Sequence, residues 1–355
     1  MTQITKHLSS LWMLLLLALT ACAVPILNQA GVFPLTPQER LALRAGVIGT
    51  PTFNPVMSGV ATRFMQDSAG FVGLRLFPAF NTALQAANYY VFDKSNMLDT
   101  PTDLRRAQSS VAKRIAMKLS SDTYSTKEYM LEGPVDDRER RKYQNQFDLD
   151  AAVVRRVLSG VMLNHEIRVH DLVTNTSLIP NSSPSIKWDG TNPTPIQDVD
   201  VAREAIHSAT GLEANTMVVS RSTFNVLKEL SVILDKIKYT ERGIVTPDLL
   251  AAVFGVQRFI VAGGLINTAN EGQALTIASL WGDDVVLAHV EMAQDLMAPN
   301  FGRTFVWTES QVGAATVKTY RDDPRHSDIH NVQQDTDEKL VGAEAGYLLS
   351  NVLTA

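Results

Sequence analysis

The segment His165–His170 holds two histidines and a glutamate, residue types that bind zinc in many enzymes. A helical zinc site needs its two histidines four residues apart, because only then do both side chains face the same side. His165 and His170 are five residues apart, which turns the second ring away from the first. His165 also lies on the apolar stripe of a predicted helix. We therefore interpret it as a core or interface histidine and predict no metal site.

Motifs for other kinds of catalysis are absent from the sequence. It contains no G-x-S-x-G nucleophile elbow, no phosphate-binding P-loop and no G-x-G-x-x-G dinucleotide fingerprint. Adjacent carboxylates at Asp136–Asp137, Asp283–Asp284 and Asp322–Asp323 could bind a cation or act as an acid and a base. Such pairs on polar loops are usually just solvated. The sequence therefore predicts no catalytic residues, no cofactor and no enzymatic activity.

The composition is that of a folded protein without a basic excess. Of the 355 residues, 45% are apolar and 19% are charged, and 32 basic residues are outnumbered by 37 acidic ones. A domain that reads nucleic acid would concentrate Lys and Arg on one face. If DNA is involved, we expect it to be enclosed and not read. The single cysteine, Cys22, excludes an intramolecular disulfide and a cysteine-based zinc site.

The N-terminus is open to more than one interpretation. Lys6 and His7 precede an apolar run, Leu11–Leu19, which is followed by Thr20, Ala21 and Cys22 as in a bacterial lipoprotein signal. The run is too short to span a membrane, which takes about 20 apolar residues. The alternatives are an apolar arm that packs against a neighbouring subunit, or a start codon placed too far upstream.

Two stretches are not expected to bury a core of their own. Residues 1–65 lack Asp, Glu, Lys and Arg between Leu8 and Gln38 and contain several prolines, which predicts an arm. Between Asp93 and Tyr143 the chain is strongly charged, which predicts a hairpin that projects from the body and is held by other chains. Its basic clusters could meet DNA or an acidic partner. A solvated hairpin or a charge-complementary contact between subunits is the stronger interpretation.

The remaining chain predicts mixed helices and strands, an α+β fold. A helix face with a period of 3.6 residues runs from Asp150 to Val173, and a second helix is expected from an Asp198 cap to Gly211. Thr246 and Pro247 begin a third helix, which Gly255 ends. Strands are predicted at 88–92, 216–220, 257–261, 275–280, 285–290, 304–307, 315–320 and 346–352.

Ten short segments, in this order and spacing, carry a resemblance to a known family. They are Leu76–Pro78, Tyr89–Lys94, Thr123–Tyr129, Ala209–Thr216, Ile237–Tyr239, Gly243–Ala252, Phe254–Val256, Asn267–Gly272, Ile277–Gly282 and Ala345–Leu348. They are spread over roughly four fifths of the chain, from Phe71 to Val352. On these residues the chain resembles the major capsid proteins of tailed bacteriophages, whose fold is shared by encapsulin shells and the herpesvirus capsid floor.

The resemblance implies an arrangement of parts. It places an N-terminal arm at 1–65, the start of a peripheral domain at 66–87, and an extended loop at 88–143. A spine helix at about 148–174 follows, within a segment 144–196 that belongs to the peripheral domain. An axial domain would span 197–300, and 301–355 would complete the peripheral domain. Contacts between subunits are expected at nine charged residues of the loop: Asp93, Lys94, Arg105, Arg106, Lys113, Arg114, Arg138, Arg140 and Arg141.

The resemblance also implies partners and a location. The chain would assemble with itself as hexamers and pentamers into an icosahedral shell in the virion, built in the host cytoplasm around DNA held without sequence specificity. A portal, a separate scaffolding protein and possible decoration proteins would be further partners, and the shell would be non-covalent because no cross-linking lysine and asparagine pair can be placed. Two alternatives stay open: an encapsulin-like compartment that encloses protein cargo, and a secreted lipoprotein with a binding function.

Overall fold

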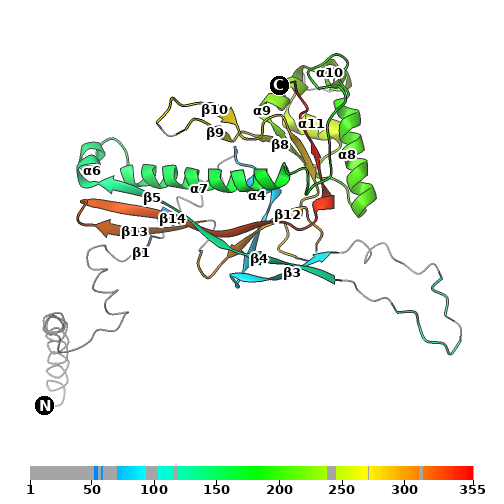
Figure 1. Ribbon diagram of the computed structural model, residues 1–355, viewed down its shortest axis with the longest axis horizontal. Coiled ribbons are helices and arrows are strands. Elements are labelled where there is room, and N and C mark those ends of the chain that lie inside the picture. Colours follow the sequence, from blue (N-terminus) through cyan, green and yellow to red (C-terminus); the bar gives the residue numbers. More distant parts are fainter. Residues whose placement is uncertain are drawn as a thin grey trace.

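The computed structural model describes residues 52–54, 57–58, 70–92, 103–106, 108–114, 119–237, 245–270, 272–296, 298–311 and 315–354 (Figure 1). Most of the predicted arm, including Cys22, lies outside these ranges, as do Asp93 and Lys94. Two residues of the predicted arm form strand β1 (Thr52–Phe53), which pairs with β13. None of the helices in the described ranges combines the length and the apolar character that crossing a membrane requires.

A six-stranded sheet forms one half of the molecule. The strand order is β1-β13-β14-β12-β2, and β5 also pairs with β14. The strands are β2 (Ala79–Thr82), β5 (Lys127–Asp136), β12 (Gly302–Trp307), β13 (Thr316–Asp322) and β14 (Ser327–Leu340), in addition to β1. The fourteen residues of β14 are long enough to pair with β13, β12 and β5, and so β14 organises the sheet.

The long helix α7 (Leu149–Val173) lies along this sheet, over β5 and β14 (Figure 1). The Asp148 carboxylate accepts a hydrogen bond from the Ala151 amide and caps its first turn. Gly133 of β5 lets the helix approach closely, because a Cβ there would lie 2.4 Å from Cγ1 of Val153. The helix predicted at Asp150–Val173 is therefore confirmed within one residue.

A five-stranded sheet forms the other half, in the order β6-β15-β11-β7-β8. Its strands are β6 (Asn181–Ser182), β7 (Thr216–Ser220), β8 (Arg258–Ala262), β11 (Val285–Ala288) and β15 (Gly346–Leu349). Both faces are covered, and alternate residues of β7 enter different cores: Met217 and Val219 pack in one, and Val218 in the other. Burial on both faces explains why β7 reads as a continuous apolar run.

Four helices contribute to the core on one face of this sheet: α8 (Pro195–Thr210), α9 (Arg221–Glu229), α10 (Ser231–Ile237) and α11 (Pro247–Phe254). The predicted limits of α11 are confirmed, since Oγ1 of Thr246 accepts from the Leu249 amide and Gly255 adopts a φ of 65°. The predicted start of α8 is wrong. The helix begins at Pro195, and Asp198 instead accepts a hydrogen bond from the buried Trp188 indole at 2.9 Å.

The core on the opposite face is shared with the C-terminal half of α7 and with the short helix α4 (Gly73–Leu76). Phe77, just after α4, meets Phe301 edge to face at a centroid distance of 5.6 Å. A Cβ at Gly302 would lie 2.3 Å from the Phe77 ring, so glycine is needed beneath it. This core joins α7 to the five-stranded sheet.

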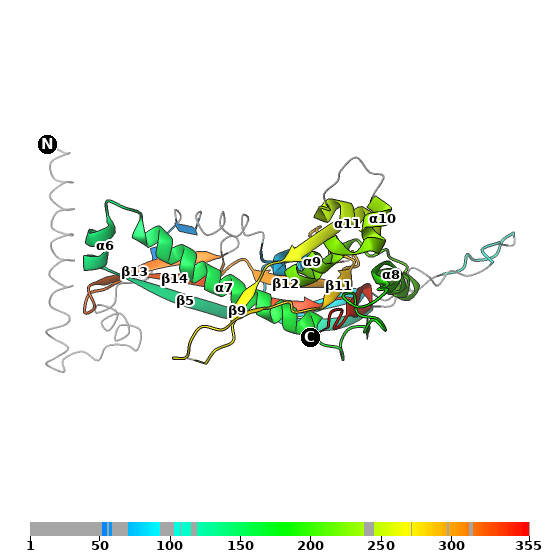
Figure 2. The same cartoon turned by 90° about the horizontal axis from the view of Figure 1, so that it is seen from above.

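Strands β3 (Ala86–Phe92) and β4 (Leu119–Ser125) pair as a ribbon that projects from one end of the molecule (Figures 1 and 2). The predicted projecting loop is too long at its C-terminal end. Residues 127–136 form β5 inside the six-stranded sheet, and Asp137–Tyr143 form helix α6. The physical reason is that β14 offers ten residues of backbone for β5 to pair with. A second, small hairpin, β9 (Leu265–Asn267) and β10 (Ile277–Ser279), extends beside α7.

Candidate assembly surfaces

Aromatic residues anchor the base of the projecting ribbon to the six-stranded sheet. The ring of Tyr124, on β4, stacks on Phe305 of β12 with a centroid distance of 4.4 Å and an interplanar angle of 4°. Tyr89, on β3, contacts the same ring at 5.1 Å, and its hydroxyl donates to Asp122. Burial raises the pKa of Tyr89. The ribbon therefore leaves the sheet from a packed base.

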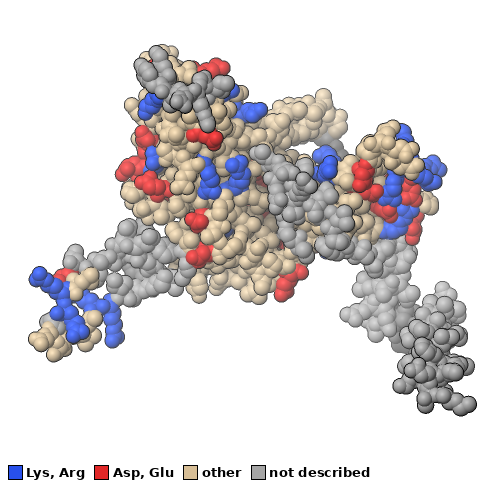
Figure 3. Space-filling model, turned by 180° about the vertical axis from the view of Figure 1, so that it is seen from behind, with Lys and Arg blue, Asp and Glu red and all other residues tan. Residues whose placement is uncertain are grey.

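The far end of the ribbon segment carries a basic surface, which we call the loop tip and define as residues 103–106 and 108–114. Four of the predicted contact residues meet there and are exposed: Arg105, Arg106, Lys113 and Arg114. Figure 3 shows this blue group well away from the body. Leu104 and Val111 are 67% and 80% exposed beside these cations. Asp103 is the carboxylate of the tip, and its backbone oxygen accepts from the Lys113 ammonium.

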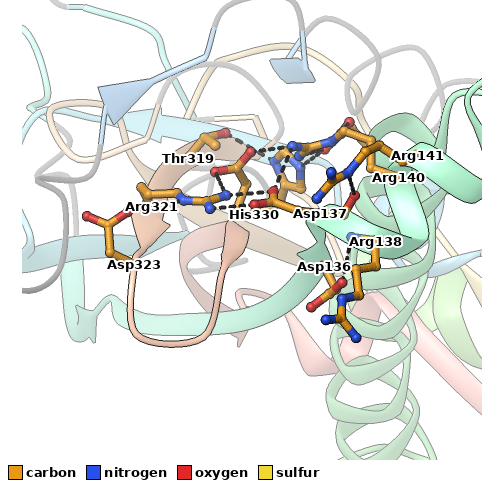
Figure 4. A network of polar contacts seen from close by, with 11 residues as sticks. Asp136, Asp137, Arg138, Arg140, Arg141, Thr319, Arg321, Asp323 and His330 are labelled. Carbon is orange, nitrogen blue, oxygen red and sulfur yellow. Dashed lines mark hydrogen bonds and ion pairs between the residues drawn. The ribbon is translucent and has the colours of Figure 1, made fainter.

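At the opposite end of the molecule, α6 and the turn between β13 and β14 form a network of ion pairs (Figure 4). Arg140 binds Asp150 at 2.7 Å and Asp328 at 2.7 Å. The predicted contact residue Arg140 is thus held within the chain. Arg138 and Arg141, also predicted, are exposed, although Arg141 donates to the backbone oxygen of Asp137.

Arg321 and His330 complete this network and were not among the predicted residues. Arg321 donates to both carboxylate oxygens of Asp137, at 2.8 and 2.6 Å, and His330 meets Asp150 at 2.8 Å. The hydrogen bond from Arg321 lowers the pKa of Asp137 to about 2. Because 184 residues separate Arg321 from Asp137, no local sequence pattern signals the pair. Only the pairing of β5 with β14 brings them together.

The two histidines of α7 have different surroundings in the structure. His165 is 4% exposed, and its Nε2 lies 3.3 Å from Oγ1 of Thr304 and 3.4 Å from Oε1 of Glu338. Burial lowers the pKa of His165 to about 4. His170 points elsewhere, with its ring edge-on to Trp281. Across the described ranges no cluster of three potential metal ligands occurs. The prediction of a core histidine is confirmed.

The adjacent aspartates singled out in the sequence make different contacts in the structure. Asp136 accepts from the Arg138 amide and caps α6, while Asp137 belongs to the ion-pair network. Asp284 accepts from the Asn351 amide, and burial raises its pKa. The structure therefore gives the Asp136–Asp137 pair, and Asp284, structural contacts.

Three similarities to known proteins accompany this geometry. The chain is 28% identical over 315 residues to the "Major capsid protein" of Burkholderia phage BcepMu, covering 84% of this chain and 96% of that one. It is similar in structure to a phage-related protein from Bordetella bronchiseptica RB50, with a TM-score of 0.69, 24% identity and coverage of 86% and 100% of the two chains. A virus-like particle from Pyrococcus furiosus matches with a TM-score of 0.52 and 12% identity, over 83% of this chain and 98% of that chain. No protein-family model matches the chain.

The sequence match and the two structural matches each extend over more than four fifths of this chain. The structures establish the fold, and the phage sequence relates the chain to a capsid subunit. The resemblance to the major capsid proteins of tailed bacteriophages is thereby confirmed, and the chain has their α+β fold.

Proposed function

We propose that the chain is a structural major capsid protein, which assembles with copies of itself into a closed shell around phage DNA. The observation that carries the proposal is the similarity to the BcepMu major capsid protein, which spans 96% of that protein. The subunit would have no catalytic role, and its function would lie in its contact surfaces. The shell would be the virion capsid, assembled in the host cytoplasm.

The projecting ribbon supports self-assembly. A two-stranded ribbon on its own is at best marginally stable in water, so contact with another surface would stabilise the part beyond the aromatic base. Leu104 and Val111 are exposed at the tip, and Leu265, Leu275 and Ile277 are 59–68% exposed on the β9–β10 hairpin. Exposed apolar groups of this kind usually mark contact surfaces. In a shell, neighbouring copies would cover them.

The charge distribution supports a contact between a basic surface of one copy and an acidic surface of another. The loop tip is strongly basic, whereas the whole chain has a formal net charge of -5. A basic projection and an acidic body attract each other and repel their own kind, which favours a head-to-tail contact. Head-to-tail contacts form rings when their rotation closes, and the resemblance to capsid proteins implies that the rings here are hexamers and pentamers.

The parts of the capsid subunit map onto the chain as follows. We assign the arm to 1–65, the spine helix to α7, and the peripheral domain to the six-stranded sheet. We assign the axial domain to the five-stranded sheet with its helices. The expected limits of 197–300 for the axial domain and 301–355 for the end of the peripheral domain need correction, because β6 and β15 lie outside 197–300 and yet belong to the five-stranded sheet. We narrow the extended loop to 86–125, because β5 belongs to the sheet. The portal, a scaffolding protein, decoration proteins and DNA bound without sequence preference would be the further partners.

A shell around protein cargo is the second candidate, favoured by the structural similarity to the virus-like particle from Pyrococcus furiosus. The two functions differ in what the shell encloses. Large particles purified from cells that express the chain with its neighbouring genes should, after nuclease treatment, retain protected DNA. Particles that contain a single enclosed protein and no protected DNA would replace the capsid proposal with the compartment.

A further inference from the structure

Helix α7 carries a buried carboxylate, Glu166, which accepts hydrogen bonds from donors in two other segments of the chain. The side chain is 0% exposed. The Val72 amide donates to both of its oxygens at 3.0 Å, and the Gly73 amide donates to Oε2 at 2.5 Å. The indole nitrogen of Trp281, which follows β10, donates to Oε1 at 2.7 Å. One carboxylate therefore joins α7, the start of α4 and the turn into the five-stranded sheet.

The residues around Glu166 leave the space that these hydrogen bonds require. A Cβ at position 73 would lie 2.9 Å from Oε2 of Glu166 and 2.8 Å from Nδ1 of His165, so Gly73 is needed for the amide to reach the carboxylate. Trp281 is 1% exposed, and the His170 ring lies edge-on to it at a centroid distance of 5.4 Å. Gly73, His165, His170 and Trp281 pack together with Glu166, and we call these five residues the joint.

An adjacent cluster ties the same turn of α7 to the other sheet. Arg168 donates to both oxygens of Glu338, on β14, at 2.9 Å each, and the Arg168 guanidinium lies 3.6 Å from the centre of the Tyr129 ring. His165 lies 3.4 Å from the same Glu338. Residues 165, 166 and 168 thus hold α7 between the two sheets.

The two buried carboxylates differ in what compensates their charge. Burial acts to raise the pKa of Glu338, but the hydrogen bonds and charge of Arg168 hold that pKa below its ordinary value. Glu166 makes no ion pair among the described residues, and burial raises its pKa. The titratable side chain that acts on it from its own helix is His170, whose charge favours the ionised form. The three donors offset part of the cost of burying this charge, and a side chain with fewer acceptor atoms would leave a buried donor unpaired.

We propose that Glu166 is a positioning residue, which sets the orientation of the five-stranded sheet on α7 and, through it, the curvature of the assembled shell. The inference rests on the proposed function for its second half. Apolar contacts in the shared core allow small rotations of packed elements, whereas three hydrogen bonds to one carboxylate have fixed directions. The joint would therefore hold the two sheets at one angle.

Glu166→Gln tests the inference, because glutamine has nearly the same shape but only one acceptor oxygen for three donors. Amide exchange at Val72 and Gly73 should become at least tenfold faster. Spin labels placed on α7 and α8, in a Cys22→Ser background with Arg156→Cys and Val201→Cys, should give a broader or shifted distance distribution. Shells from the variant should have an altered diameter or a mixture of diameters.

Glu338→Gln is the matched control, since it makes the same chemical change in the neighbouring cluster. It should leave amide exchange at Val72 and Gly73 within twofold of the parent rates and should leave the distribution of label distances unchanged. Trp281→Phe removes a single donor while keeping a ring, and should produce a smaller effect of the same kind. If Glu166→Gln does not fold, Trp281→Phe tests the positioning role in its place.

The outcomes separate this inference from the proposed function. Unchanged exchange, label distances and shell diameter in Glu166→Gln would overturn the positioning role while leaving the capsid proposal intact. A parent chain that forms no shells would overturn the capsid proposal and the curvature effect. The exchange and label measurements on the subunit would then still show whether Glu166 orients the sheet.

Discussion

At the scale of residues, opposite charges hold the end of the molecule formed by α6, β13 and β14. Arg321 bridges Asp137, Asp323 and Asp328, and Arg140 reaches Asp137, Asp150 and Asp328. These groups are partly exposed, so each pair contributes modestly to stability. Their main effect is on the ionisation of Asp137.

Arg321→Gln should raise the pKa of Asp137 from about 2 towards its ordinary value of 3.8, because the lost guanidinium supplies the main stabilisation of the ionised form. Since the folded pKa is the lower one, the favourable contribution is present above about 3.8 and disappears as the pH falls towards 2. Carboxyl carbon NMR measures the titration directly. A titration midpoint for Asp137 near 3.8 in the unsubstituted chain would contradict this account.

His165 should titrate near pH 4 in the folded subunit, because burial disfavours its charged form. In the unfolded chain it accepts a proton near pH 6.5, so acidification below that pH favours unfolding until the folded pKa is reached. Between pH 7 and pH 5 the free energy of unfolding should fall by about 2 kcal/mol more in the parent chain than in His165→Gln. Urea unfolding at both pH values measures this, and equal losses would refute it.

At the scale of elements, helix α7 depends on glycine in the neighbouring strand. Gly133→Ala should lower the free energy of unfolding by about 1–3 kcal/mol, since the new methyl group would overlap Val153 and Val157. Gly264→Ala is the control, because its Cβ would meet ordinary contacts at 3.7 Å from Leu280. Denaturant titration of the unassembled subunits compares the two. A smaller loss for Gly133→Ala than for Gly264→Ala would argue against close packing of α7 on β5.

The ribbon should matter for assembly and little for folding. Replacing residues 93–118 by a short Gly-Ser turn keeps the aromatic base at Tyr89 and Tyr124, so the subunit should retain its circular dichroism spectrum and thermal midpoint. It should form few shells, as measured by sedimentation velocity. A second variant, with Arg105, Arg106, Lys113 and Arg114 changed to alanine, separates the contribution of charge from that of length. Normal shells from the shortened chain would rule out a role for the loop in assembly.

Local signals in the sequence predicted some elements well. Caps act within a few residues, and so Thr246, Gly255 and Gly211 marked helix ends that the structure confirms. The start of α8 was misplaced because Asp198 resembles a cap but serves as the partner of Trp188. Strand β14 was not predicted at all. Its buried Asn331, Gln333 and Asp335 find their partners across the sheet, and no local pattern reveals such pairing.

The candidate surfaces were predictable to a similar degree. The basic loop tip follows from a run of cations with little apolar content, and the structure brings those cations together. The ion-pair network of Arg321 and the joint at Glu166 depend on contacts between residues about 90 to 184 apart in the chain. Only the folded arrangement of the sheets reveals them.

At the scale of the whole molecule, two sheets share one long helix, and projections extend from the body (Figures 1 and 2). The shared helix couples the orientation of one sheet to that of the other, while the projections supply surfaces for neighbours. This division suits a subunit that must repeat in a closed shell, where many modest contacts sum to a stable assembly.

Electron cryomicroscopy of the large particles formed by the expressed chain tests the central claim most directly. The account predicts closed shells with icosahedral symmetry, in which the loop tip of each subunit lies against a neighbouring copy. Recovery of the chain solely as small soluble species or as membrane-bound material, with and without its neighbouring genes, would contradict the claim.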